Sequence, residues 1–156
     1  MSATRPPLPS PTVRRVEPTD AEAWVRLRDV LWPGSLDEHR REVAAYFETP
    51  PDGWTCLVAE VAADGVIGFV EVGMRAYAEG CRSSPVGYVE GLLVAESHRK
   101  RGMGRALVHA AERWAGEQGC TEMASDRETH NEDSGRFHAA LDYEEVERIV
   151  CFRKSL

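Results

Sequence analysis

The residues best suited to bind a ligand form a basic, glycine-containing segment from His98 to Arg105. It follows an apolar run and precedes a segment with helical periodicity, so its backbone N–H groups should lie at the start of a helix. Those N–H groups have no acceptor within the helix, and the helix dipole adds partial positive charge, which suits an anion such as a pyrophosphate. At Gly102 and Gly104 the backbone can approach the anion closely, where a Cβ atom would intrude.

The spacing Arg99-x-x-Gly102-x-Gly104 differs from two common phosphate-binding motifs. No Gly-Lys-Ser/Thr follows, as a nucleotide-binding P-loop requires, and Leu107 stands where a dinucleotide-binding fingerprint has its third glycine. Two plainer interpretations stay open: a turn with a solvated basic face, or a nucleic-acid patch. Because this is the one dense basic cluster in an acidic chain, the pattern favours a phosphate-bearing ligand.

Two carboxylates are candidates for acid–base chemistry. Glu90 interrupts an apolar strand pattern, on the face of Leu92 and Val94 if the strand is regular, where a carboxylate is unusual. A salt bridge to a basic residue on the neighbouring strand, such as Arg75, would explain it, and so would a functional role. Asp126 ends the next predicted strand, where mixed sheets often border a ligand crevice, although turn aspartates are common.

The composition narrows the class of partner. Lys plus Arg total 19 and Asp plus Glu total 26, giving a formal net charge of −7. This charge disfavours nucleic acid and anionic membranes and suits a small cation, although many soluble domains are mildly acidic. The chain has neither an apolar run of ~20 residues nor a secretory signal, so we expect a cytoplasmic protein with no membrane contact. The four cysteines lack a C-x-x-C pair, so no metal is expected.

The elements that must position these residues follow from periodicity and turn signals. Residues 1–12 are proline-rich and are expected to form a disordered tail, and residues 13–156 one domain. Capping boxes at Thr19 with Glu22 and at Ser35 with Glu38 predict two helices, and the Asp-Gly pair at 64–65 predicts a hairpin. Strands are expected at 13–17, 54–61, 66–75, 86–94, 120–125 and 145–153, and helices at 19–32, 35–48, 103–119 and 131–141. The mixture predicts an α/β (α+β) sheet with helices on both faces.

From residue 13 to residue 154 the chain resembles the aminoglycoside 6′-N-acetyltransferases of the GNAT superfamily. The shared text, besides the basic segment, is Leu31-Trp32-Pro33-Gly34, Gly80-Cys81, Ser83-Ser84-Pro85-Val86, Glu90-Gly91, Glu122-Met123-Ala124-Ser125-Asp126, Asn131 and the segment from Glu144 to Lys154. The resemblance implies a GNAT acyltransferase fold with a mixed central sheet, acetyl-CoA as the donor, the 6′-amine of an aminoglycoside as the acceptor, and a homodimer.

The resemblance also assigns residues to the cofactor. It implies that CoA is bound by Leu92, Leu93, Val94, Arg99, Arg101, Gly102, Met103, Gly104, Arg105, Asn131 and Ser134. A plain N-cap role explains Asn131 equally well, and Ser134 could simply be solvated. A backbone donor for the oxyanion is expected near Leu92 or Leu93.

At the acceptor end, the amine must lose a proton before it attacks, so a nearby carboxylate is expected. We expect Asp126 and Glu90 to bind the ammonium, and one of them to serve as the base. Trp32 and Tyr77 could wall the acceptor cleft or simply pack, and Glu79 and Glu128 could extend an acidic rim or simply be solvated.

Two positions depart from the family pattern. His138 stands where many GNAT enzymes place a tyrosine acid, so its role stays open between catalysis, cofactor contact and packing. Asp142-Tyr143 replaces a common Gly-Phe. Two other functions also stay open: a GNAT enzyme acting on a polyamine or a protein amine, and a non-catalytic acyl-CoA-binding module.

Overall fold

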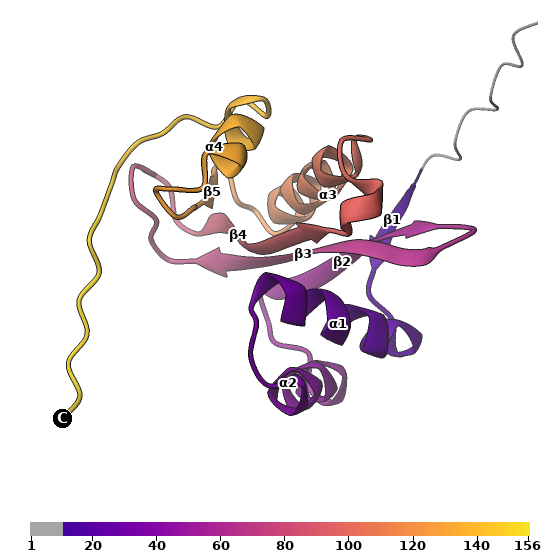
Figure 1. The fold of residues 1–156 in the computed structure, drawn as a ribbon. Helices are drawn as coiled ribbons and strands as arrows, with labels where there is room; N and C mark the ends of the chain where they lie inside the picture. Colours follow the sequence, from indigo (N-terminus) through magenta and orange to yellow (C-terminus); the bar gives the residue numbers. More distant parts are fainter. Residues whose placement is uncertain (1–10) are drawn as a thin grey trace, which may run out of the picture.

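A single mixed sheet forms the centre of the computed structural model, which describes residues 11–156 (Figure 1). Its five strands lie in sequence order: β1 (Thr12–Arg15), β2 (Trp54–Val61), β3 (Gly65–Arg75), β4 (Val86–Val94) and β5 (Met123–Ser125). The first four pair antiparallel, and β5 pairs parallel with β4. The predicted mixed sheet and its early hairpin are therefore confirmed.

Helices cover both faces of this sheet, as predicted. On one face lie α1 (Ala21–Leu31) and α2 (Leu36–Glu48), and on the other lie α3 (Met103–Glu117) and α4 (Glu132–Ala139) (Figure 1). Two short 3-10 turns, η1 (Pro18–Asp20) and η2 (Glu96–His98), precede α1 and α3. Among the described residues, no helix combines the length and apolar character needed to cross a membrane.

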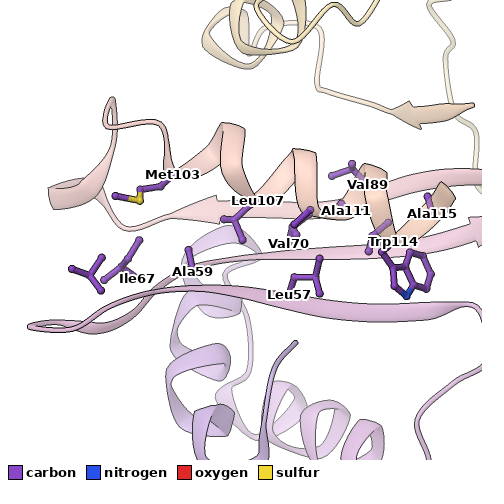
Figure 2. Close-up of a cluster of buried hydrophobic side chains, with 13 residues drawn as sticks. Leu57, Ala59, Ile67, Val70, Val89, Met103, Leu107, Ala111, Trp114 and Ala115 are labelled. Atoms are coloured by element: carbon purple, nitrogen blue, oxygen red, sulfur yellow. The ribbon is translucent and has the colours of Figure 1, made fainter. Parts of the chain in front are cut away.

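The two faces carry separate hydrophobic cores. On the α3 side, Leu107 and Ala111 are fully buried and point toward Val70 and Leu57 of the sheet (Figure 2). The opposite core surrounds Trp24 and includes residues of α1, α2, β2 and β3. Because β4 contributes side chains to both cores, its position between α1 and α3 is tightly determined.

The helix starts were only partly predicted. Ser35 Oγ accepts a hydrogen bond from the Glu38 backbone N–H at 3.3 Å, as expected for α2. The predicted box at Thr19 is wrong, because the chain first makes the turn η1, where the Glu17 backbone N–H donates to the Asp20 carboxylate at 2.8 Å. Asp20 is also paired with Arg14 of β1 at 2.6 Å, a long-range partner that local spacing cannot reveal.

The predicted final strand is also wrong. Residues 144–156 have no regular secondary structure and extend away from the sheet (Figure 1). A strand needs a partner edge, and the adjacent edge strand, β5, is only 3 residues long. The predicted tail lies outside the described residues except for Pro11 and Thr12, and Thr12 pairs with Glu60 as the first residue of β1.

Candidate active site

A cavity of about 410 Å³ opens where the pairing of β4 with β5 ends. The two strands pair only as far as Val89 with Ser125, after which β4 continues alone to Val94. The space beyond is closed by α4, by the loop after β5 and by the end of α1. Its lining includes most of the residues expected at the reaction centre: Trp32, Glu90, Leu92, Asp126, Asn131, Ser134 and His138.

A β-bulge shapes the wall that β4 gives to this cavity. The register with β3 pairs Glu71 with Gly91 and Val72 with Val89, so Glu90 is the extra residue. A regular strand would have placed Glu90 on the face of Leu92 and Val94. The bulge instead places its carboxylate oxygen 3.5 Å from the position that a Cβ of Gly73 would take, on the opposite face.

Arg75 neutralises Glu90 in this structure. Its Nε donates to Glu90 Oε1 at 2.9 Å and its Nη2 donates to Oε2 at 2.6 Å. This two-point contact, with burial opposing it, raises the pKa of Arg75. The salt bridge that could explain a carboxylate in β4 therefore exists, and the same carboxylate also borders the cavity.

Asp126 is held by Tyr88, which sequence reasoning missed. The Tyr88 hydroxyl donates to Asp126 Oδ2 at 2.7 Å, and the guanidinium carbon of Arg75 lies 3.4 Å from the centroid of the Tyr88 ring. Burial, then the bond to Asp126, raises the pKa of Tyr88, so this phenol stays neutral and donates a hydrogen bond to the Asp126 carboxylate. From sequence alone, a tyrosine within a strand is expected to pack in the core. The contact becomes visible only once β4 is known to pair with β5.

Ser125 and His138 form a second polar pair in the cavity. His138 Nδ1 lies 2.7 Å from the carbonyl oxygen of Ser134, which can only accept, so Nδ1 carries the proton. His138 Nε2 lies 2.9 Å from Ser125 Oγ, within hydrogen-bond distance. The sequence singled out His138 but not Ser125, whose position at the end of β5 was the available signal.

The basic segment does form a helix start, but its two glycines have different physical reasons. Gly102 adopts a left-handed conformation with φ of 82° and has open space around it, as an anion-binding turn requires. At Gly104 a Cβ atom would lie 3.1 Å from the Phe137 ring of α4. Gly104 therefore permits close packing of α3 against α4, in addition to any approach by a ligand.

Several side chains expected to contact the cofactor point elsewhere. Met103 is buried in the α3 core, and Leu93 packs in the opposite core. Arg99 Nε donates to the Val94 carbonyl at 2.9 Å, and Arg105 Nη2 donates to the Ala140 carbonyl at 2.9 Å. The backbone groups of these four residues remain available to bind a ligand. So do the guanidinium N–H groups of Arg99 and Arg105 that these two hydrogen bonds do not use. Val94 packs against the α3 core, and Arg101 lies exposed in the turn before α3.

Some of the remaining predicted residues line the cavity, and others do not. Asn131 caps α4, where its Oδ1 accepts from the Ser134 backbone N–H at 3.1 Å, and it also lines the cavity. Trp32 lines the cavity too, and so does Glu128. Tyr77 is 66% exposed, and neither Tyr77 nor Glu79 reaches the cavity lining.

Sequence comparisons identify relatives over most of the chain. Residues 22–143 match the model of the Acetyltransferase (GNAT) family. A Klebsiella aerogenes protein, aminoglycoside N(6′)-acetyltransferase type 1, is 44% identical over 149 residues, covering 94% of this chain and 98% of that protein. A Serratia marcescens protein of the same name is 42% identical over 137 residues, covering 86% and 92%.

Solved structures show the same likeness. AAC(6′)-Iy in complex with the bisubstrate analogue CoA-S-monomethyl-acetylneamine matches with a TM-score of 0.86 at 38% identity, covering 94% of this chain and 99% of that one. The 6′-N-acetyltransferase AAC(6′)-Ih from Acinetobacter baumannii matches with a TM-score of 0.87 at 31% identity and the same coverage. The shared architecture therefore extends over nearly the whole chain.

Proposed function

The chain belongs to the GNAT family of acetyltransferases, and from this premise we propose that it transfers the acetyl group of acetyl-CoA to the 6′-amine of an aminoglycoside. The observation that carries the proposal is a cavity that β4 lines and that holds two carboxylates, Glu90 and Asp126. The same strand leads through η2 into the left-handed turn at Gly102 that opens α3. Relatives at up to 44% identity carry this activity in their names. We place the enzyme in the cytoplasm, where acetyl-CoA is made.

The donor site fits the residues present. We assign the pyrophosphate to the backbone N–H groups from Gly102 to Arg105, since the first turn of a helix has no internal acceptor for them. Beyond Val89 the edge of β4 has lost its β5 partner within residues 11–156, so its backbone groups are available to the pantetheine arm. Asn131 and Ser134 line the cavity at the start of α4, and we assign them to this arm as well.

The two carboxylates differ in the partner that each one has. Arg75 already compensates Glu90, whereas the partner of Asp126 is the neutral Tyr88 hydroxyl. We therefore assign proton removal from the 6′-ammonium to Asp126, and orientation of the substrate cation to Glu90. Trp32 walls the acceptor end, whereas the exposed Tyr77 and Glu79 would need to meet a large substrate beyond the cavity.

The transfer itself needs little further assistance. The neutral amine forms a bond to the acetyl carbon, the oxyanion accepts a hydrogen bond from a β4 backbone N–H at Leu92 or Leu93, and the C–S bond breaks. The proton left on the nitrogen balances the departing CoA thiolate, giving the amide and the thiol. His138 contacts the Ser134 carbonyl through Nδ1 and Ser125 Oγ through Nε2, so we assign it to holding Ser125 and α4 in place.

We also propose that the enzyme is a homodimer joined through residues 144–156. This segment leaves the sheet without a partner strand among the described residues (Figure 1). It has strand-forming composition, yet its apolar side chains are exposed, Val150 by 78% and Phe152 by 94%. Exposed β-branched and aromatic residues in an extended segment suit strand pairing with a second copy of the chain.

An assay with two matched acceptors tests the proposed reaction. Purified protein with acetyl-CoA should release free thiol when given an aminoglycoside bearing a 6′-amine, and should not do so when that amine is a hydroxyl. Equal release from both compounds would refute the 6′ assignment. Release with a linear polyamine but with neither drug would instead support a different amine substrate, and no release with any acceptor would support a binding module.

A further inference from the structure

Glu71 is a buried carboxylate that the proposed reaction does not use. It lies on β3, only 4% exposed, and faces α1. Its Oε1 accepts a hydrogen bond from Trp24 Nε1 at 2.9 Å and lies 3.3 Å from Arg28 Nη1. Its register partner on β4 is Gly91, directly after the bulge at Glu90. A charge at this depth, next to the distortion that shapes the cavity, requires a physical reason.

The guanidinium of Arg28 connects Glu71 to two tryptophans. Its carbon lies 5.8 Å from the ring centroid of Trp24 and 5.4 Å from that of Trp32. From the outer side, Arg28 Nη2 contacts Glu42 of α2 at 2.5 Å. Two carboxylates on different elements therefore fix the plane of the guanidinium beneath the Trp32 ring.

This arrangement is poorly suited to stabilising the fold alone. The Nε–H of Arg28 is buried with no hydrogen-bond partner among the described residues, and a buried donor left unpaired is costly. Buried ion pairs often contribute less than apolar packing would, because desolvation offsets their attraction. The cluster of Glu71 and Arg28 is better suited to fixing a position.

The group that it positions is Trp32. The Trp32 carbonyl accepts from His39 Nε2 at 3.0 Å, which fixes the backbone after α1. The far edge of the indole lies so close over Gly91 that a Cβ there would overlap two ring atoms. The same indole lines the cavity beside Glu90. A shift of the ring would therefore change the width of the acceptor end.

We propose that Glu71 and Arg28 are positioning residues that hold the Trp32 indole against Gly91 and so set the acceptor end of the cavity. The identity of the acceptor rests on the proposed function above, but the positioning of Trp32 does not. We assign the donor to the start of α3 and to α4, whereas Glu71 faces α1 and Arg28 lies on α1, so neither residue belongs to the proposed donor site. Loss of the pair should therefore affect the acceptor and leave acetyl-CoA binding intact.

Arg28→Met tests this, with Arg40→Met as the matched control. Methionine keeps the length and apolar stem of Arg28 without its charge and planar head, while Arg40 is paired on the same helical hairpin with Glu22 and Asp37, away from the cavity. For Arg28→Met we expect the KM for the aminoglycoside to rise about tenfold with little change in kcat, because a misplaced wall weakens acceptor alignment. The Kd for acetyl-CoA should stay unchanged, and Arg40→Met should leave all three values unchanged.

A second readout does not depend on turnover. The indole N–H resonance of Trp32, assigned through Trp32→Phe, should shift in Arg28→Met and not in Arg40→Met. If Arg28→Met does not fold, the double variant Arg28→Met with Glu71→Gln, which leaves no buried charge unpaired, takes its place. An unchanged Trp32 resonance, or a shifted resonance with an unchanged acceptor KM, would overturn the proposal. Absence of turnover in the unaltered protein would instead refute the proposed function, and the resonance would still decide the positioning.

Discussion

Replacing Glu71 with glutamine should change how the stability of the protein depends on pH. Burial, opposed by Arg28 and by the bond from Trp24, raises the pKa of Glu71 from its ordinary 4.5 to about 6. The folded state therefore binds this proton more tightly than the unfolded state does. The sign follows: the contribution of Glu71 to stability is fully present below its unfolded pKa and is lost as the pH rises through about 6.

The size of the effect follows from the two pKa values. Each unit of difference between folded and unfolded states is worth roughly 1.4 kcal/mol, so raising the pKa of Glu71 to about 6 corresponds to about 2 kcal/mol. Glu71→Gln keeps the shape and an oxygen for the Trp24 N–H but cannot titrate. The free energy of unfolding of the natural protein, relative to this variant, should thus fall by about 2 kcal/mol between about pH 4 and pH 7.5.

Urea unfolding of both proteins across this pH range provides the measurement. Groups that titrate identically in the two proteins cancel in the difference, and equal m-values would show that both unfold to comparable states. A difference that does not vary with pH, or that grows in favour of the natural protein as the pH rises, would refute the account of a buried, poorly compensated Glu71.

Three further changes test other parts of the structure. Asp126→Asn should lose most turnover while the Kd for acetyl-CoA, measured by calorimetry, stays the same; an unchanged rate would remove this carboxylate from the mechanism. Gly104→Ala should lower the melting temperature because the new Cβ meets the Phe137 ring at 3.1 Å, whereas Gly116→Ala, in open space on the same helix, should stabilise by up to about 1 kcal/mol; similar effects of the two would contradict the packing described for Gly104. Deleting 144–156 should convert the proposed dimer to a monomer by light scattering, and an unaltered mass would reject this segment as the interface.

Local patterns predicted most of the fold. The apolar spacing of α3, the Asp-Gly hairpin at 64–65 and the Ser35 cap each depend on residues close in sequence, and all three are confirmed. The start of α1 was mispredicted because Asp20 is held by Arg14 of β1. The segment 145–153 has the composition of a strand, but composition cannot supply the partner that a strand requires.

The difference between local and long-range information also explains which parts of the site could be predicted. The helix start at Gly102 and the carboxylates Glu90 and Asp126 could be found from residue type and position. The contact of Tyr88 with Asp126 depends on the parallel pairing of β4 with β5, and Arg75 reaches Glu90 only through the bulged register with β3. Neither pairing is encoded at short range. Arg75 could be named from the sequence only as a possible partner of Glu90, and the contact of Tyr88 emerged only from the structure.

The position of the acetyl group in the product tests the central claim most directly. The proposed enzyme should convert an aminoglycoside with several amines into a single monoacetylated product, and two-dimensional NMR of that product should place the new amide on the 6′ nitrogen. An acetyl group on any other amine, or recovery of the drug unmodified after incubation with acetyl-CoA, would contradict the account.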